Sequence, residues 1–134
     1  MIRLCIVVFW ASVLSLVACR QGARCATCGM KIDAASAWVS YVTVGGKELA
    51  FDTPRCALAA WRRSPNGATA RFREYYSQEL KPAESLRFVR GSDVVGPMGP
   101  DLVPVATENA GRFARDHNGA PPVSVEQLLE GEAR

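Results

Sequence analysis

The chain has little of what zinc sites and nucleic-acid-binding surfaces are usually built from. It contains one histidine and a single Cys-x-x-Cys pair, whereas a closed zinc site normally needs a second cysteine pair or a His pair. It also lacks a large excess of positive charge. Without residues 1–18, which carry Arg3 and no acidic residue, the 16 basic residues fall to 15 against 13 acidic ones. A closed zinc site is therefore weakly supported, and so is nucleic-acid binding, which needs a clustered basic face.

Residues 1–18 have the pattern of a bacterial signal peptide. Arg3 supplies a positive start, and an apolar run over residues 4–16 follows, which is too short to span a bilayer as a stable helix. The segment ends in Leu-Val-Ala-Cys, which resembles the lipobox cut before a lipid-bearing cysteine, so Cys19 is the expected lipidation site. Because Arg20 follows it in place of aspartate, resemblance to Gram-negative lipoproteins favours the outer membrane. An ordinary secretory signal that leaves Cys19 without lipid is the alternative.

The number of cysteines points to a bound metal. Cys5 leaves with the signal peptide, and Cys19 carries lipid, so Cys25, Cys28 and Cys56 remain in an oxidising compartment. Three thiols cannot all pair with one another, so at least one of them is free or bound to a metal.

A first group of elements is predicted between the cysteine pair and the middle of the chain. β-Branched and aromatic residues are typical of strands, Gly45-Gly46 fits a tight hairpin turn, and Thr53-Pro54 is typical of a helix start. The expected elements are strands over 38–44, 47–52 and 70–77 and a helix from 53 to about 63.

A similar series is predicted in the second half. Alternation around Phe88 indicates a strand, Pro104 places a later strand at an edge or bulge, and Thr107 is expected to cap a second helix. The expected elements are strands over 85–90, 102–106 and 123–125, a loop over 91–100, a helix from 107 to about 117 and a terminal helical turn near 125–129.

The two series match in order, because residues 51–53 open the first helix as residues 105–107 open the second. A unit of roughly fifty residues buries too little apolar surface to be stable alone, so we expect the two units to pack together. The sequence therefore predicts an α+β fold of two repeated ββαβ units, with two accidental strand-strand-helix runs as the alternative. The expected divisions are a signal peptide at 1–18, a lipid tether with the cysteine motif at 19–36, a first unit at 37–80 and a second at 81–134.

The stretch Cys-Ala-Thr-Cys-Gly-Met from Cys25 to Met30 places two thiols and a thioether close together. Such soft sulfur donors select Cu(I) and zinc over magnesium or calcium. Gly29 permits the backbone angles that let Cys28 and Met30 converge on one ion. Cu(I) suits this incomplete set better than zinc, because it does not demand four ligands.

Two other uses of the cysteine pair stay open. The first is a thiol-disulfide oxidoreductase that uses Cys25 and Cys28, although the pair precedes a strand and does not begin a helix, where a thiol pKa would be lowered. The second is a plain disulfide between the same two cysteines in a structural or interaction lipoprotein.

Residues 25–32, Cys-Ala-Thr-Cys-Gly-Met-Lys-Ile, resemble the Cys-x-x-Cys-Gly-Met-x-Ile stretch of the NosL family. Residues 51–56 are similar to the family's Phe-Asp-x-x-x-Cys helix opening, and residues 97–110 resemble its Pro-Met-Gly segment, strand and helix. The resemblance covers about residues 16–130. It implies two ββαβ units and a periplasm-facing lipoprotein that binds Cu(I) and delivers it for assembly of the copper centres of nitrous oxide reductase. The implied partners are an ABC-type maturation complex and the reductase itself.

Carried over by motif, the resemblance implies Cys25, Cys28 and Met30 as metal ligands, together with Met98 of the Pro-Met-Gly segment. The expected protein is a copper chaperone and not an enzyme. Its client need not be nitrous oxide reductase, because nothing in the sequence identifies the recipient.

Three further residues are expected to have structural roles. Cys56 lies on the inward face of a helix, where a cysteine is usually a small buried hydrophobe. His117 is expected at the surface near a helix end. Asp52 is expected to be a carboxylate of the capping region, because no second acid or nucleophile is placed with it.

Overall fold

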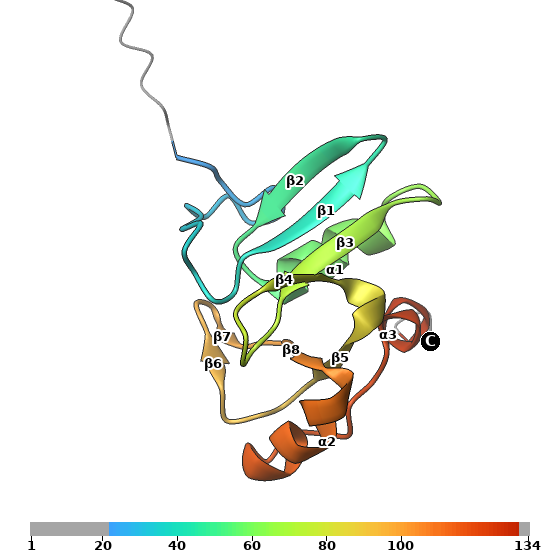
Figure 1. Cartoon of the computed structure of the whole chain (residues 1–134). Coiled ribbons are helices and arrows are strands. Elements are labelled where there is room, and N and C mark those ends of the chain that lie inside the picture. Colours follow the sequence, from blue (N-terminus) through green and yellow to red (C-terminus); the bar gives the residue numbers. More distant parts are fainter. Residues whose placement is uncertain (1–21, 132–134) are drawn as a thin grey trace, which may run out of the picture.

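The computed structural model describes residues 22–131 (Figure 1). The predicted signal peptide and Cys19 lie outside the described residues. Among the helices of residues 22–131, none has the length and apolar character needed to cross a bilayer.

An antiparallel sheet in the order β2-β1-β3-β4 forms the larger part of the fold, and helix α1 lies against one of its faces (Figure 1). Gly45 and Gly46 connect β1 to β2 with φ angles of 56° and 78°, as the tight turn requires. Thr53 caps α1 as predicted, because its side chain accepts a hydrogen bond from the N–H of Cys56. The elements are β1 (Ser40–Val44), β2 (Lys47–Phe51), α1 (Pro54–Arg62), β3 (Thr69–Arg73) and β4 (Leu80–Pro82).

The second half has a smaller antiparallel pair, β5 with β8, and helix α2 packs against both strands (Figure 1). Between β5 and β8, the expected loop contains a short hairpin of β6 and β7. The elements are a 3-10 turn η1 (Ala83–Ser85), β5 (Leu86–Val89), β6 (Val95–Gly96), β7 (Gly99–Pro100), β8 (Val103–Ala106), α2 (Thr107–Asp116) and α3 (Val125–Glu130). The α+β class is thus confirmed.

The expected strand at 123–125 is reduced to a single bridge between Val123 and Phe88. Ser124 ends it, because its side chain and that of Gln127 form a capping box that begins α3. Where the repeat expects a second ββαβ unit, the chain has the β5–β8 pair, α2 and a single bridge, with the β6–β7 hairpin and α3 in addition, so the repeat of two ββαβ units stays a prediction.

Phe72 of β3 and Phe88 of β5 join the two halves of the chain. Both rings are buried, and they meet edge to face with their centroids 5.0 Å apart. The same cluster of buried side chains includes Val42 of β1 and Leu128 of α3. Residues 37–80 and 81–131 therefore share one hydrophobic core, while Phe113 belongs to a second cluster between α2 and the β5–β8 pair.

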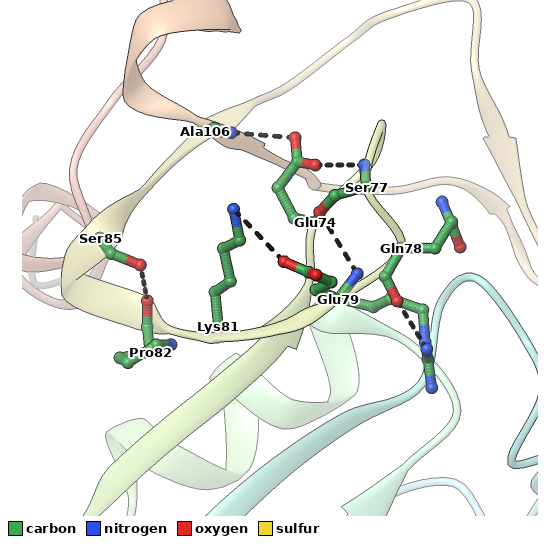
Figure 2. Close-up of polar contacts among 9 residues, drawn as sticks. Glu74, Ser77, Gln78, Glu79, Lys81, Pro82, Ser85 and Ala106 are labelled. Atoms are coloured by element: carbon green, nitrogen blue, oxygen red, sulfur yellow. Dashed lines mark hydrogen bonds and ion pairs between the residues drawn. The ribbon is translucent and has the colours of Figure 1, made fainter.

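Two sequence predictions are wrong near Glu74. Strand β3 ends at Arg73 and does not reach residue 77, because the Glu74 carboxylate accepts a hydrogen bond from the N–H of Ser77 at 2.6 Å and turns the chain (Figure 2). Thr107 is the first residue of α2, and the capping position is held by Ala106, with no side-chain cap. The Thr107 hydroxyl instead lies 3.4 Å from the carbonyl oxygen of Ser85.

Candidate metal centre

The Cys25–Met30 motif forms a tight turn that is closed by its own backbone. The N–H of Cys25 donates to the carbonyl oxygen of Met30 at 2.8 Å, and the N–H of Gly29 donates to that of Cys25 at 2.9 Å. Gly29 adopts a φ of 76°, which is the left-handed conformation that glycine takes most readily. The turn therefore presents the side chains of Cys25 and Cys28 from one short stretch of backbone.

The turn is held against the start of α1. The hydroxyl of Thr27 donates to the carbonyl oxygen of Cys56 at 3.0 Å, and the N–H of Ala26 donates to the carbonyl oxygen of Ala50 at 3.3 Å. Since Asp52 lies between the end of β2 and the cap of α1, these bonds bring the turn, Asp52 and Cys56 together.

Four potential ligands meet at this point: Cys25, Cys28, Asp52 and Cys56. One ligand atom from each lies within 4.8 Å of the others, a spacing that could hold a metal ion. The Sγ of Cys28 is 3.5 Å from each carboxylate oxygen of Asp52. Cys28 is exposed, whereas the other three residues are buried. We call this group the cysteine–aspartate cluster; it is open to solvent on the side of Cys28.

The protonated thiol is favoured at two of these cysteines. For Cys28, the backbone N–H of Met30 stabilises the thiolate, but partial burial and the neighbouring Cys25 outweigh it and raise the pKa. Burial raises the pKa of Cys56 far above its ordinary value, against the smaller opposing effect of its Thr53 hydrogen bond. Because the thiolate is the metal ligand, binding of a cation here displaces protons and supplies the positive charge that the thiolates otherwise lack.

The side chains of the two methionines predicted as ligands are both exposed. Met30 is 42% exposed and lines a small hollow of about 150 Å³ together with Asp52 and Pro97. Met98 follows Pro97 in the turn between β6 and β7 and is 54% exposed. The β6–β7 hairpin thus reaches the same side of the molecule as Met30 and Asp52.

The sequence motif predicts Cys25 and Cys28 as ligands, and the structure brings them together as free thiols. Cys56 and Asp52, which also lie in the cluster, were not among the predicted ligands. Cys56 is buried as expected, but it also faces the other two thiols. The Phe-Asp-x-x-x-Cys spacing was the available signal, because it puts a carboxylate and a thiol on either side of a helix cap. His117 lies elsewhere, with its Nδ1 2.9 Å from Asp93.

The comparisons with known proteins give one match. No curated protein and no solved structure matches the chain. The NosL family model matches residues 16–130, which include the whole cysteine–aspartate cluster and the Pro-Met-Gly turn. The chain therefore belongs to the NosL family.

Proposed function

We propose that this protein is a membrane-anchored Cu(I) chaperone that faces the periplasm and supplies copper for assembly of the nitrous oxide reductase copper centres. The observation that carries the proposal is the convergence of three thiols, from Cys25, Cys28 and Cys56, in a chain of the NosL family. Thiolates are the ligands that soft Cu(I) prefers. Met30 and Met98 are proposed as additional thioether ligands that reach the ion from the exposed side.

A chaperone must release its ion as well as bind it, and the exposure of the cluster supports release. Cys28 is exposed, so a ligand from a partner protein can reach an ion there and displace this chaperone's sulfurs one at a time. Cys25 and Cys56 are buried and hold the inner side of the site. Because tight binding of copper is easily achieved, release is the harder requirement. The exposed side of the cluster allows that release.

Exposed apolar side chains near the cluster support contact with a partner on the same side. Within residues 22–131, the large apolar side chains that are exposed include Met30, Val95 and Met98. Val95 and Met98 belong to the β6–β7 hairpin, whose Pro97 shares a hollow with Met30. An exposed apolar patch is typical of a protein contact site. The proposed partners are the ABC-type maturation complex and the reductase, and the proposed anchor is a lipid on Cys19, with an outer-membrane location.

Anaerobic titration of the full chain in detergent with Cu(I), against a chromophoric Cu(I) chelator, tests the proposal. We expect one tightly bound ion per chain. Replacing both Cys25 and Cys28 by Ser is expected to abolish that binding, whereas His117→Gln, which removes a metal-binding side chain outside the cluster, is expected to leave it unchanged. Absence of tight binding, or equal binding by the double variant, would contradict the proposal.

A second assay distinguishes the chaperone from the alternative, a thiol-disulfide oxidoreductase. A chaperone does not accelerate the reduction of insulin by dithiothreitol, whereas an oxidoreductase that uses Cys25 and Cys28 does. The pair supports the chaperone, because the turn precedes β1, neither cysteine belongs to a helix, and the pKa of the exposed Cys28 thiol is raised and not lowered. Catalysis that is lost in Cys28→Ser would favour the alternative.

A further inference from the structure

A pocket of about 430 Å³ lies where α1, α3 and the segments that follow β5 and β7 meet. Small-molecule sites in proteins usually have volumes of about 300–1,000 Å³, so this pocket is large enough for a small ligand. No residue of the cysteine–aspartate cluster lines it, so it is separate from the candidate metal centre. We call it the arginine pocket; its lining includes Arg55, Leu58, Arg62, Arg90, Leu102 and Leu128.

The arginine pocket combines positive charge with an apolar floor. The lining residues of α1, from Arg55 to Arg62, are spaced i, i+3, i+4 and i+7, so they share one face of the helix. The side chains of Leu58, Leu102 and Leu128 are buried and form the floor. The pocket therefore offers both charged and apolar contacts to whatever enters it.

Backbone carbonyl groups hold two of the guanidinium groups in place. Nη2 of Arg55 donates to the carbonyl oxygen of Pro100, and Nη2 of Arg62 donates to the carbonyl oxygen of Leu128. A carbonyl oxygen is a neutral acceptor, so each bond orients a guanidinium group without removing its positive charge. These two charges are therefore fixed beside the pocket before any ligand binds.

Arg90 adds a third positive charge from the segment after β5. It is exposed, and its side chain forms no hydrogen bond or ion pair with another residue of the described part of the chain. Asp101 is the one acidic residue among the described residues that line the pocket, and one of its oxygens already accepts the N–H groups of Arg55 and Leu102. The described lining thus carries three positive charges against one negative charge.

We propose that the arginine pocket binds an organic anion that carries a phosphate or carboxylate group on a compact apolar body. Guanidinium groups form paired, charge-assisted hydrogen bonds with such oxygens, which favours an anion over a neutral ligand. An apolar body would cover the leucine floor, which a bare inorganic ion leaves in contact with water. The inference goes beyond the proposed function, because it concerns a second ligand and none of the cysteines.

Isothermal titration calorimetry of the full chain in dodecyl maltoside, a neutral detergent, tests the inference with phenyl phosphate as the ligand. Phenyl phosphate is charged and water-soluble, and its ring supplies the apolar body. We expect saturable binding of one phenyl phosphate per chain. Inorganic phosphate, which lacks the ring, and benzyl alcohol, which lacks the charge, are each expected to bind about tenfold more weakly or less.

Variants separate the charge of the pocket from its space. Arg90→Gln removes one exposed charge and is expected to weaken phenyl phosphate binding by about tenfold or more. Ala59→Phe fills the pocket from α1 but keeps all three arginines, and it is expected to abolish binding. Arg115→Gln changes an exposed arginine of α2 outside the pocket and should bind as the wild type does. Circular dichroism checks that each variant folds.

A competition experiment distinguishes two sources of such an anion. Displacement of phenyl phosphate by dihexanoyl phosphatidylglycerol, a soluble phospholipid, would support a lipid headgroup as the natural ligand, and its failure to compete would support a small soluble anion. Absence of saturable binding, or wild-type affinity in both Arg90→Gln and Ala59→Phe, overturns the inference. Inorganic phosphate that binds as tightly as phenyl phosphate overturns it as well. Because Arg90→Gln is expected to leave Cu(I) binding unchanged, this inference and the proposed function can fail separately.

Discussion

The carboxylate of Glu74, in the turn after β3, accepts a hydrogen bond from the backbone N–H of Ala106 at 3.1 Å, just before α2 begins (Figure 2). The two residues are 32 positions apart in sequence, and Glu74 is 1% exposed. Its other carboxylate oxygen accepts the N–H of Ser77. One buried side chain thus ends β3 and attaches the first half of the chain to the start of α2.

Glu74→Gln is expected to destabilise the protein at neutral pH. Burial opposes the charged form of Glu74, but hydrogen bonds from Ser77 and Ala106 outweigh it and lower its pKa from the ordinary value of 4.5. The glutamine has one acceptor oxygen in place of two, so we expect a loss of about 1–3 kcal/mol in the free energy of unfolding by urea at pH 7. Glu79→Gln, at an exposed position, is the control and is expected to change it by less than about 0.5 kcal/mol.

The effect of Glu74 should also depend on pH. Because its pKa is lower in the folded than in the unfolded protein, its stabilising contribution is complete above pH 4.5 and is lost as the pH falls through the folded pKa. The difference in unfolding free energy between wild type and Glu74→Gln should therefore shrink in strongly acidic urea melts. A difference that is constant with pH would show that the charge is not involved.

Asp101 should tolerate asparagine but not alanine. One of its carboxylate oxygens accepts the N–H of Leu102 at 2.7 Å and that of Arg55 at 3.1 Å, which ties the segment after β7 to the first turn of α1. Asparagine keeps that oxygen. Burial raises the pKa of Asp101, so loss of the charge is not costly. We expect Asp101→Ala to lose about 1–3 kcal/mol in thermal or urea unfolding and Asp101→Asn much less; equal losses would contradict this.

Gly29 should be needed for the geometry of the metal turn. Its φ of 76° costs an alanine about 1–2 kcal/mol, although nothing lies within 4 Å of an added Cβ. Gly29→Ala is expected to lower both the melting temperature and Cu(I) affinity, and Gly29→Asn to lower them less, since asparagine enters this conformation more easily. Gly111→Ala, inside α2, is the control and should be neutral or stabilising. An unchanged Gly29→Ala protein would mean that the turn can adjust.

Met30 and Met98 are expected to affect Cu(I) binding through their sulfur atoms and not through their side-chain volume. Met30→Leu and Met98→Leu keep the approximate volume of two exposed side chains but remove the thioether. If each sulfur reaches the ion, each change should weaken Cu(I) binding by about tenfold or more, as measured by chelator competition. Val95→Ala, in the same hairpin but without a donor atom, should leave the affinity unchanged. Full affinity in both leucine variants would remove the methionines from the site.

Local chemistry explains why several elements could be predicted from the sequence. Gly45-Gly46 dictates a tight turn, and Thr53 followed by proline dictates a helix start, because both depend on residues that are adjacent in the chain. The capping position of α2 could not be predicted in this way. The N–H of Ala106, at that position, donates to the carboxylate of Glu74, and only the packing of two distant segments brings that side chain close enough.

The residues of the candidate site differ in the same way: some can be recognised from the local sequence, and others only from the packing of distant segments. Cys25, Cys28 and Met30 are recognisable in the sequence because soft donors lie within a few residues of one another. Cys56 and Asp52 become their neighbours only when Thr27 and Ala26 bind the turn to the end of β2 and the start of α1. The sequence by itself determined the α+β class, the soft character of the site and the family. The tertiary structure alone decided that a third thiol and a carboxylate join the first two, because a ligand set is defined by distances in space, and those distances follow from packing between segments that are separate in the chain.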